Sequence, residues 1–320
     1  MSRPSGLRVS VPAEARGQRL DKFLAAELAA KNLSRSRLRV LMDAGAVLVD
    51  GALRPAKYSL RGGEALDVAL PEAAPTSIKA TKIPLDVLFE DKDLLVINKP
   101  AGLVTHPGAG HFDDTLANAL LYHCGRSLKA GAKGMRPGIV HRLDKDTSGC
   151  LVAAKSEAAF SGLQAMIAAR QVTRVYLTLV WGDLPEDSGT IDAPLGRGAD
   201  RKRMDVRPGS GKAAVTHFTV RRRFAQATEL ECRLETGRTH QIRAHLRSIG
   251  HAVVGDRSYN RVPAHLPEGL REALDKVLKR QALHAYQLQF RHPITKRMVR
   301  AQAPEPADFR AARKVLKGAA

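Results

Sequence analysis

The chain of 320 residues is poor in cysteine, in aromatic side chains and in long apolar stretches. Its three cysteines, Cys124, Cys150 and Cys232, are far apart and form no C-x-x-C pair, which argues against a disulfide framework and against a zinc site. We find no apolar stretch that resembles a membrane span or the core of a secretion signal. We therefore expect a protein of the reducing cytoplasm with no membrane anchor.

Acidic residues are also in deficit. The chain has 52 Lys and Arg against 32 Asp and Glu, a formal net charge of +20 that is spread along the whole sequence. This balance predicts a polyanionic partner, with nucleic acid ahead of a membrane surface. Ribosomal proteins share this charge profile, so charge alone does not indicate an enzyme.

The sequence predicts two domains, residues 1–70 and residues 81–320, joined by a linker at 71–80 that carries Pro71 and Pro75. In the first, Leu20, Phe23, Leu24 and Leu28 have the spacing of a buried helical face. A second helix, with Ser34 as its expected cap, carries Arg35 and Arg39 and is followed by short strands. This order resembles the S4 RNA-binding module, although a generic basic mini-domain would show the same periodicities. The resemblance implies that Arg35 and Arg39 contact RNA backbone.

A polar run stands near the middle of the chain. The string H-R-L-D-K-D-T-S-G, residues 141–149, follows an apolar lead-in at Ile139 and Val140 that we expect to be a short strand. Within it, Asp144 lies between the cations Arg142 and Lys145, an arrangement that favours an ionised carboxylate when water leaves a site. From composition alone, a surface turn with weak local ion pairs is the simpler interpretation.

A second polar run, L-E-T-G-R-T-H-Q-I-R, covers residues 234–243. Thr239 is expected to cap a helix that runs to about residue 249. On that helix His240, Arg243 and Arg247 share a face and can converge on an anion. A metal is not expected, because His240 and His245 are five residues apart and no carboxylate completes a site. The glycine-rich segments at 102–110 and 209–212 lack the spacing of a nucleotide-binding loop, so we expect no cofactor.

Both strings resemble the signatures of the RluA-type family of RNA pseudouridine synthases. The resemblance implies an α+β fold, in which a mixed, mostly antiparallel sheet with flanking helices forms a central cleft. It implies that Asp144 is the catalytic aspartate and that Arg243 lies against it. Tyr176, in an R-x-Y setting on a strand where it points away from the predicted core face, would lie beside the target base. Arg142, Arg238 and His240 would complete the contacts with RNA, and the isomerisation needs neither metal nor cofactor.

Further resemblances bear on the substrate. The S4-like unit and H-P-G-A-G at 106–110 are typical of the branch of the family that modifies large-subunit ribosomal RNA. We therefore expect a monomer that acts on 23S RNA, in a hairpin loop of a ribosomal precursor or subunit. Another ribosomal or transfer RNA site is an alternative. A base-excising glycosylase and a non-catalytic ribosome-assembly protein are further ones. The stretch from Val254 to Lys279 is predicted to be a surface insertion.

Overall fold

The computed structural model describes residues 6–28, 35–69, 78–108, 110–131, 137–198, 200, 203–259, 262, 263 and 265–319. The chain divides into two compact units, residues 1–76 and 77–320, each with its own apolar core. Most of the predicted linker, residues 71–77, lies outside the described residues. Within the described part of the chain, no helix is long and apolar enough to cross a bilayer.

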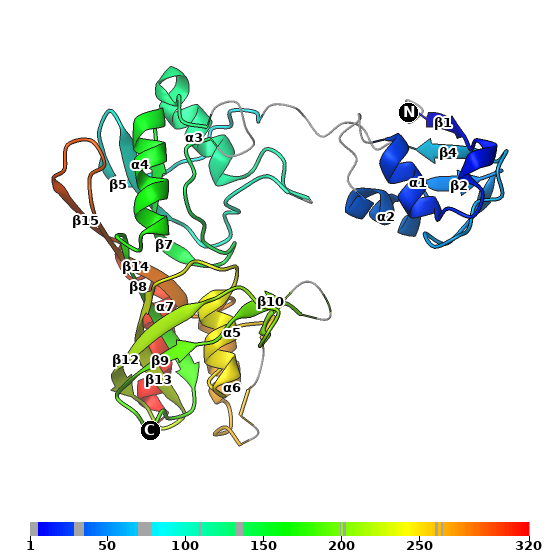
Figure 1. Ribbon diagram of the computed structural model, residues 1–320. Coiled ribbons are helices and arrows are strands. Elements are labelled where there is room, and N and C mark those ends of the chain that lie inside the picture. The colour runs from blue at the N-terminus through cyan, green and yellow to red at the C-terminus, as the bar shows by residue number, and fades with distance from the viewer. Residues whose placement is uncertain are drawn as a thin grey trace. The chain divides into compact units, whose positions relative to one another are not determined.

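The small unit is an antiparallel sheet with two helices (Figure 1). Its strands lie in the order β1-β4-β2-β3 and its elements are β1 (Gly6–Ser10), α1 (Leu20–Glu27), α2 (Arg35–Asp43), β2 (Val47–Val49), β3 (Ala52–Leu53) and β4 (Ala65–Ala69). The predicted apolar face of α1 is confirmed, because Leu20, Phe23, Leu24 and Leu28 are all buried. Arg39 on α2 is exposed, whereas the side chain of Arg35 and the predicted cap Ser34 lie outside the described structure.

A mixed sheet of nine strands forms the centre of the large unit. Its main path is β5-β6-β7-β14-β8-β13-β12-β9, and β15 pairs with β14. The strands are β5 (Asp86–Glu90), β6 (Leu94–Lys99), β7 (Ser148–Ala154), β8 (Thr173–Trp181), β9 (Ser188–Asp192), β12 (Val215–Arg223), β13 (Ala227–Leu234), β14 (Leu283–Arg291) and β15 (Met298–Gln302). All these pairings are antiparallel except β7 with β14. The predicted mixed, mostly antiparallel sheet is thus confirmed.

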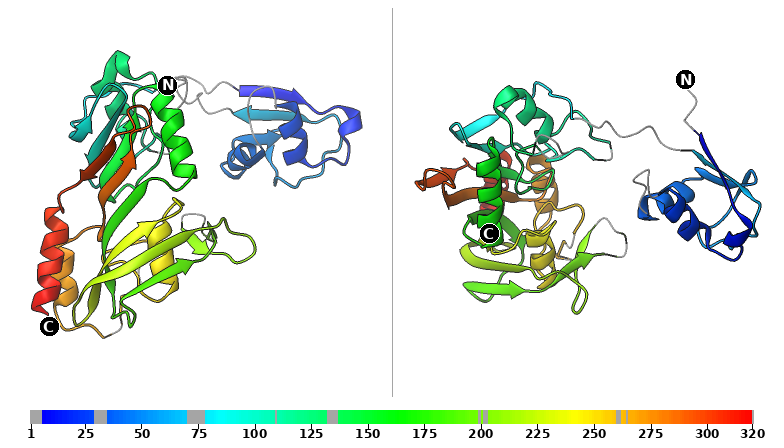
Figure 2. Two further views of the ribbon diagram at one scale, coloured as in Figure 1. Left: turned by 60° about the vertical axis from the view of Figure 1, so that its left-hand side comes forward. Right: turned by 45° about the horizontal axis from the view of Figure 1, so that its top comes forward.

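Helices cover the sheet, and a short hairpin extends from it. The helices are α3 (Leu116–Cys124), α4 (Glu157–Ala168), α5 (Gln241–Ser248), α6 (Leu270–Val277) and α7 (Ala307–Gly318), and the hairpin pairs β10 (Leu195–Arg197) with β11 (Met204–Val206). Helix α4 packs on β7, and α6 lies beside α7 (Figures 1 and 2). Phe309, Ala312 and Leu316 of α7 are buried.

The parallel pairing of β7 with β14 positions the polar run at residues 141–149. Ser148 and Gly149 at the start of β7 pair with His284 and Ala285 of β14. Gly149 has φ +112°, and a side chain there would overlap the carbonyl of Ala285. This glycine therefore permits the close approach of the two strands, and the loop at residues 140–147 ends where they meet.

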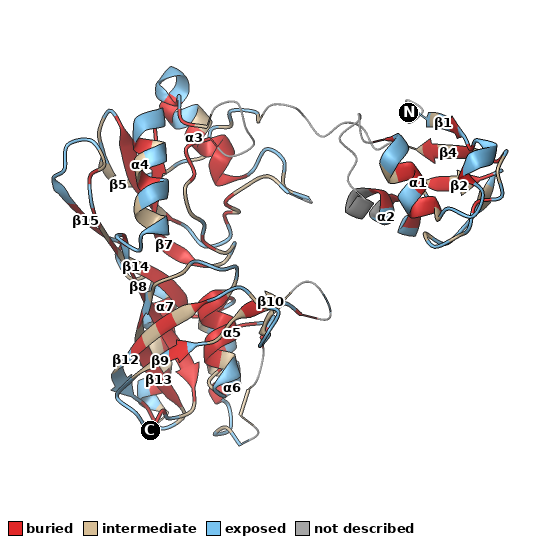
Figure 3. Cartoon of the chain, in the orientation of Figure 1, coloured by how far each residue is buried: buried red, intermediate tan, exposed pale blue. Residues whose placement is uncertain are grey.

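Four local predictions are wrong. Strand β8 is buried on both faces, so Tyr176 is not opposite the core but part of it, as Figure 3 shows for the strand. Ile139 forms only an isolated bridge with Ala153. Helix α5 begins after His240, a left-handed residue with φ +53°, and not after Thr239. The segment from Val254 to Lys279 is not a surface insertion, because it contains α6 and several of its side chains are fully buried.

Candidate active site

A buried lysine, Lys99, holds the loop that carries Asp144. Lys99 Nζ donates hydrogen bonds to the carbonyls of Pro100, Leu103 and Lys145, at 2.8, 2.9 and 3.0 Å. Burial lowers the pKa of Lys99 to about 7, partly opposed by the carboxylates of Asp146 and Asp144. One side chain thus joins the end of β6 to the residue that follows Asp144.

Further contacts fix both ends of the same loop. Thr105 Oγ1 donates to the Leu143 carbonyl at 2.8 Å, and Arg280 Nη1 donates to the Asp146 carbonyl at 3.0 Å. His141 Nε2 accepts a hydrogen bond from the Val152 backbone N–H at 3.0 Å, and burial lowers the pKa of this imidazole to about 3. The backbone on either side of Asp144 is therefore held by hydrogen bonds from separate elements.

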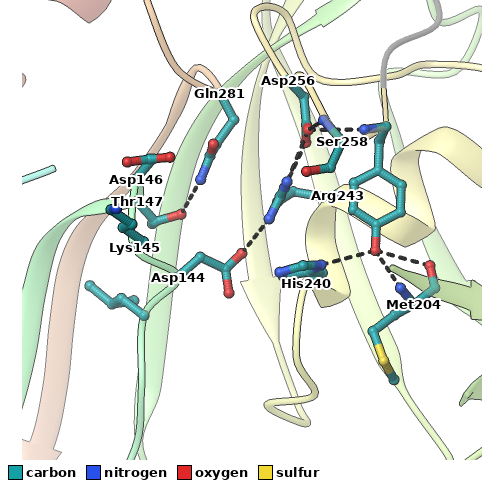
Figure 4. A network of polar contacts seen from close by, with 12 residues as sticks. Asp144, Lys145, Asp146, Thr147, Met204, His240, Arg243, Asp256, Ser258 and Gln281 are labelled. Atoms are coloured by element: carbon teal, nitrogen blue, oxygen red, sulfur yellow. Dashed lines mark hydrogen bonds and ion pairs between the residues drawn. The ribbon is translucent and has the colours of Figure 1, made fainter. Parts of the chain in front are cut away.

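Asp144 and Arg243 meet across 99 positions of sequence. Arg243 Nη1, on the first turn of α5, donates to Asp144 Oδ2 at 2.9 Å (Figure 4). The Asp144 side chain is 15% exposed, whereas that of Arg243 is 5% exposed. The arginine is therefore a fixed part of the protein interior, and the carboxylate is the partner that faces the solvent.

A second carboxylate holds the arginine in place. Arg243 Nε and Nη2 donate to the two oxygens of Asp256 at 2.6 and 2.9 Å, a bidentate pair in which the Asp256 side chain is fully buried. Asp256 Oδ1 also accepts from the backbone N–H groups of Ser258 and Tyr259. Burial alone would lower the pKa of Arg243, but its bonds to Asp256 and Asp144 raise the pKa above the ordinary value.

Tyr259 links this arginine to His240. The ring of Tyr259 lies under the guanidinium of Arg243, at 5.0 Å, and its hydroxyl bonds both backbone groups of Met204. His240 Nδ1 lies 3.1 Å from the same hydroxyl. Because the phenol donates its single hydrogen to the Met204 carbonyl, Nδ1–H of His240 is the donor in this contact. Burial lowers the pKa of His240, and attraction to Asp144 partly opposes this.

The candidate residues line one cavity of about 480 Å³. Its wall contains six of the residues that the sequence analysis singled out: Arg142, Asp144, Tyr176, Arg238, His240 and Arg243. Arg142 and Arg238 are exposed, and Arg238 Nε donates to the Ala213 carbonyl at 3.1 Å. Burial raises the pKa of Tyr176 to about 12, so its phenol is neutral at pH 7. The cavity has the size of a small-molecule site and presents both cations and a ring.

One other predicted cation of the large unit, Arg247, does not line this cavity. Arg247, expected to converge with Arg243, instead lies 3.5 Å from Asp205 on β11. Arg35 and Arg39 belong to the small unit, which is described separately from this cavity. The prediction that Arg247 converges with Arg243 on an anion is therefore wrong, because Arg247 forms an ion pair with Asp205 of the hairpin.

Three residues of the site are not evident from the sequence. The sequence pattern predicts Asp256 and Tyr259 at the surface and indicates no role for Arg174. Arg174 also lines the cavity; it is 5% exposed, and its Nε has no hydrogen-bond partner among the described residues. The available signal for Asp256 is a lone carboxylate that follows the apolar run Ala252-Val253-Val254 and Gly255. For Arg174 it is the short distance along the strand from Tyr176.

A metal could be considered at one cluster. Among the described residues, Asp91, Asp93 and His292 bring one ligand atom each within 4.8 Å of one another. However, His292 Nδ1 accepts hydrogen bonds from the N–H groups of Ile294 and Thr295, so its hydrogen lies on Nε2, 2.9 Å from Asp91. A ring nitrogen that carries hydrogen cannot bind a metal, and the cluster is better explained by a hydrogen bond from His292 to Asp91 that closes the turn before β15.

Similarity to known proteins extends over nearly the whole chain. Residues 93–248 match the family model described as RNA pseudouridylate synthase. The chain is 44% identical to Ribosomal large subunit pseudouridine synthase D of Zymomonas mobilis, covering 97% of both proteins. It is 47% identical to the protein of the same name from Xanthomonas campestris, over 95% of this chain and 91% of the relative. The structure of Human RNA Pseudouridylate Synthase Domain Containing 4 is similar with a TM-score of 0.57 and 28% identity, covering 72% of this chain and 93% of the other.

Proposed function

The chain belongs to the RluA-type family of RNA pseudouridine synthases, and from that premise we propose that Asp144 is its catalytic carboxylate and large-subunit ribosomal RNA its substrate. The reaction class follows from the family: the enzyme is an isomerase that converts uridine in RNA to pseudouridine. The observation that supports Asp144 most strongly is its hydrogen bond at 2.9 Å to the buried Arg243, in the wall of the main cavity.

The isomerisation places definite demands on the protein. The bond from N1 of uracil to C1′ of the ribose breaks, the base turns, and C5 joins C1′. The hydrogen on C5 is lost and N1 gains one, so the product has the same composition as the substrate. A carboxylate beside the sugar can attack C1′, add to the base, or remove a proton from C2′. Asp144 can serve in any of these three ways.

Arg243 keeps the carboxylate aimed in this proposal. A desolvated carboxylate without a cationic partner tends to take up a proton. The fork of Arg243 is fixed on one side by Asp256, so its Nη1 group points at Asp144 before substrate arrives. Such preorganisation is a general source of rate enhancement, because no rearrangement is needed during the reaction.

The target base must leave its stack before it can react. Extruding a base costs a few kcal/mol, and stacking on an aromatic side chain contributes about 1–3 kcal/mol. We propose Tyr176, which lines the cavity, as that stacking ring. The exposed Arg142 would fill the space left by the base or contact the phosphate of the extruded nucleotide. Arg238 and His240 would contact the same nucleotide from the other wall.

The proposed substrate rests on the relatives. Several proteins 44–47% identical to this chain are named for the ribosomal large subunit. We propose a hairpin loop of 23S RNA as the target, modified by a monomer in the cytoplasm. The small unit would act as an S4-like domain in which Arg35 and Arg39 contact the RNA backbone. These contacts would add affinity but contribute little sequence specificity.

Incubation with unmodified RNA transcripts tests this substrate. The purified protein is mixed with transcripts of large-subunit, small-subunit and transfer RNA, and pseudouridines are mapped in each. Pseudouridine at discrete positions of the large-subunit transcript alone is expected. Modification of only the small-subunit or transfer RNA contradicts the substrate assignment, and abasic sites in place of pseudouridine contradict the isomerase.

A further inference from the structure

Two smaller hollows continue from the main cavity. The first, of about 220 Å³, shares Asp144, His240 and Arg243 with the main cavity and so lies on the other side of the ion pair. The second, of about 290 Å³, shares Gly255, Arg257 and Lys279 with the first. The three hollows therefore adjoin one another in a row that begins at Asp144, each sharing lining residues with the next, and we call this row the depression.

Two exposed cations stand where the smaller hollows meet. Arg257 and Lys279 line both, and neither side chain has a hydrogen bond or ion pair within the described residues. The other arginines of the first hollow are already engaged: Arg243 is bound to two carboxylates, and Arg280 to Asp308 at 2.7 and 2.9 Å. Arg257 and Lys279 are thus available to an anion that arrives from solvent.

The backbone beneath these two cations is fixed. Arg257 follows Asp256, whose side chain is fully buried in the bidentate pair with Arg243. Lys279 precedes Arg280, which binds the Asp146 carbonyl and Asp308. The two segments also touch, because a side chain at Gly255, with φ +75°, would overlap the Arg280 carbonyl. A binding site built on such anchored backbone needs only the two outer side chains to adjust.

Charge determines where in the depression an anion can lie. The inner end of the first hollow contains Asp144 and Asp146, which repel an anion, while Lys145 there contacts His111 Nε2 at 3.3 Å. In the second hollow, Asp275 lies one helical turn from Arg271 on α6 and lines the same hollow as Arg257 and Lys279. Because Asp256 is bound to Arg243, Asp275 is left to face Arg257, Arg271 and Lys279, and positive charge is in excess at the junction where the two smaller hollows meet.

We propose that Arg257 and Lys279 bind a backbone phosphate of the RNA strand that flanks the target nucleotide. The inference deepens the proposed function and rests on it, since the target base is taken to occupy the main cavity. With the reacting sugar at Asp144, the strand that leaves it runs along the depression, and the next phosphates reach the junction. The contact would position the strand and carry no sequence information.

Binding of a 12-residue oligouridylate at several salt concentrations tests the proposal. The variant R257Q/K279Q is compared with R310Q/K314Q, which also removes one exposed Arg and one exposed Lys, from α7, and lines neither hollow. Losing one phosphate contact lowers the slope of log affinity against log salt by about 0.7 for single strands. This slope change corresponds to about fivefold weaker binding at 0.1 M salt than wild type.

The expected result is that R257Q/K279Q shows this change, R310Q/K314Q does not, and the charge-preserving R257K/K279R retains wild-type binding. With a large-subunit transcript as substrate, R257Q/K279Q should raise KM about fivefold and leave kcat unchanged. An unaltered salt slope in R257Q/K279Q, or equal effects in both glutamine variants, overturns the proposal. If wild type forms no pseudouridine in any transcript, the proposed function fails, while the oligouridylate comparison still decides whether the junction binds phosphate.

Discussion

Replacing Arg243 by lysine separates the charge of this residue from its geometry. The guanidinium makes three charge-assisted hydrogen bonds, two to Asp256 and one to Asp144. A lysine keeps the positive charge, but its single ammonium on a longer flexible stem cannot reproduce a bidentate bond and a third bond in another direction. R243K therefore removes the aiming of Asp144 without leaving the buried carboxylates unneutralised.

The magnitude follows from the bonds that are lost. A hydrogen bond to a charged group contributes about 1.5–3 kcal/mol net. If lysine retains two of the three bonds, the free energy of unfolding should fall by about 1.5–3 kcal/mol. A displacement of a catalytic group by about 1 Å can cost about 10²-fold in rate, so kcat should fall at least that far, with KM little changed.

Single-turnover formation of pseudouridine and urea unfolding measure the two effects. R247K is the matched control, because Arg247 lies one turn further along α5 and forms a half-exposed pair with Asp205. It should alter both quantities little, since exposed ion pairs contribute at most about 1 kcal/mol. A destabilised R243K enzyme whose kcat equals that of wild type would refute the role of Arg243 in aiming Asp144.

Three more outcomes are expected. Acid should destabilise the large unit, because burial lowers the pKa of His141 to about 3 from an ordinary 6.5. Between these values the unfolded chain binds more protons, so the unfolding free energy falls with decreasing pH by up to about 1.4 kcal/mol per unit; a fall as steep in H141Q would contradict this. G149A should lower the free energy of unfolding, measured by denaturation, by roughly 3 kcal/mol, because of backbone strain and overlap with Ala285. G250A, at φ +94° with open space around it, should lower the free energy of unfolding less. Deleting residues 1–76 should weaken RNA binding in filter assays yet leave single-turnover chemistry, because the large unit has its own core; a folded but inactive truncation would contradict this.

Much of the fold could be read from local patterns. The spacing of Leu20, Phe23, Leu24 and Leu28 predicts the buried face of α1. Such elements are determined by residues a few positions apart. Tyr176 was misplaced because the alternation rule assumes that one face of a strand meets solvent, and β8 is covered on both faces.

Less of the site than of the fold could be predicted from the sequence. Its two polar strings were found, yet their meeting was inferred only from a family resemblance, because no local pattern relates Asp144 to Arg243. Asp256 was missed for the same reason, since its partner lies 13 residues away on a helix. The start of α5 was misjudged because His240 adopts a left-handed conformation there and its ring lies against Tyr259. These features depend on tertiary contacts, which periodicity does not report.

The role of Asp144 is tested most directly by the isosteric variant D144N, assayed for pseudouridine in large-subunit RNA by nuclease digestion and chromatography. D187N, which alters an exposed carboxylate paired with Arg223, is the control. The amide oxygen that D144N introduces can still accept the hydrogen bond from Arg243, so folding and RNA binding should persist. Turnover should fall on the order of 10⁴-fold or more in D144N and remain unchanged in D187N. Turnover by D144N within tenfold of wild type would contradict the assignment of Asp144 as the catalytic carboxylate.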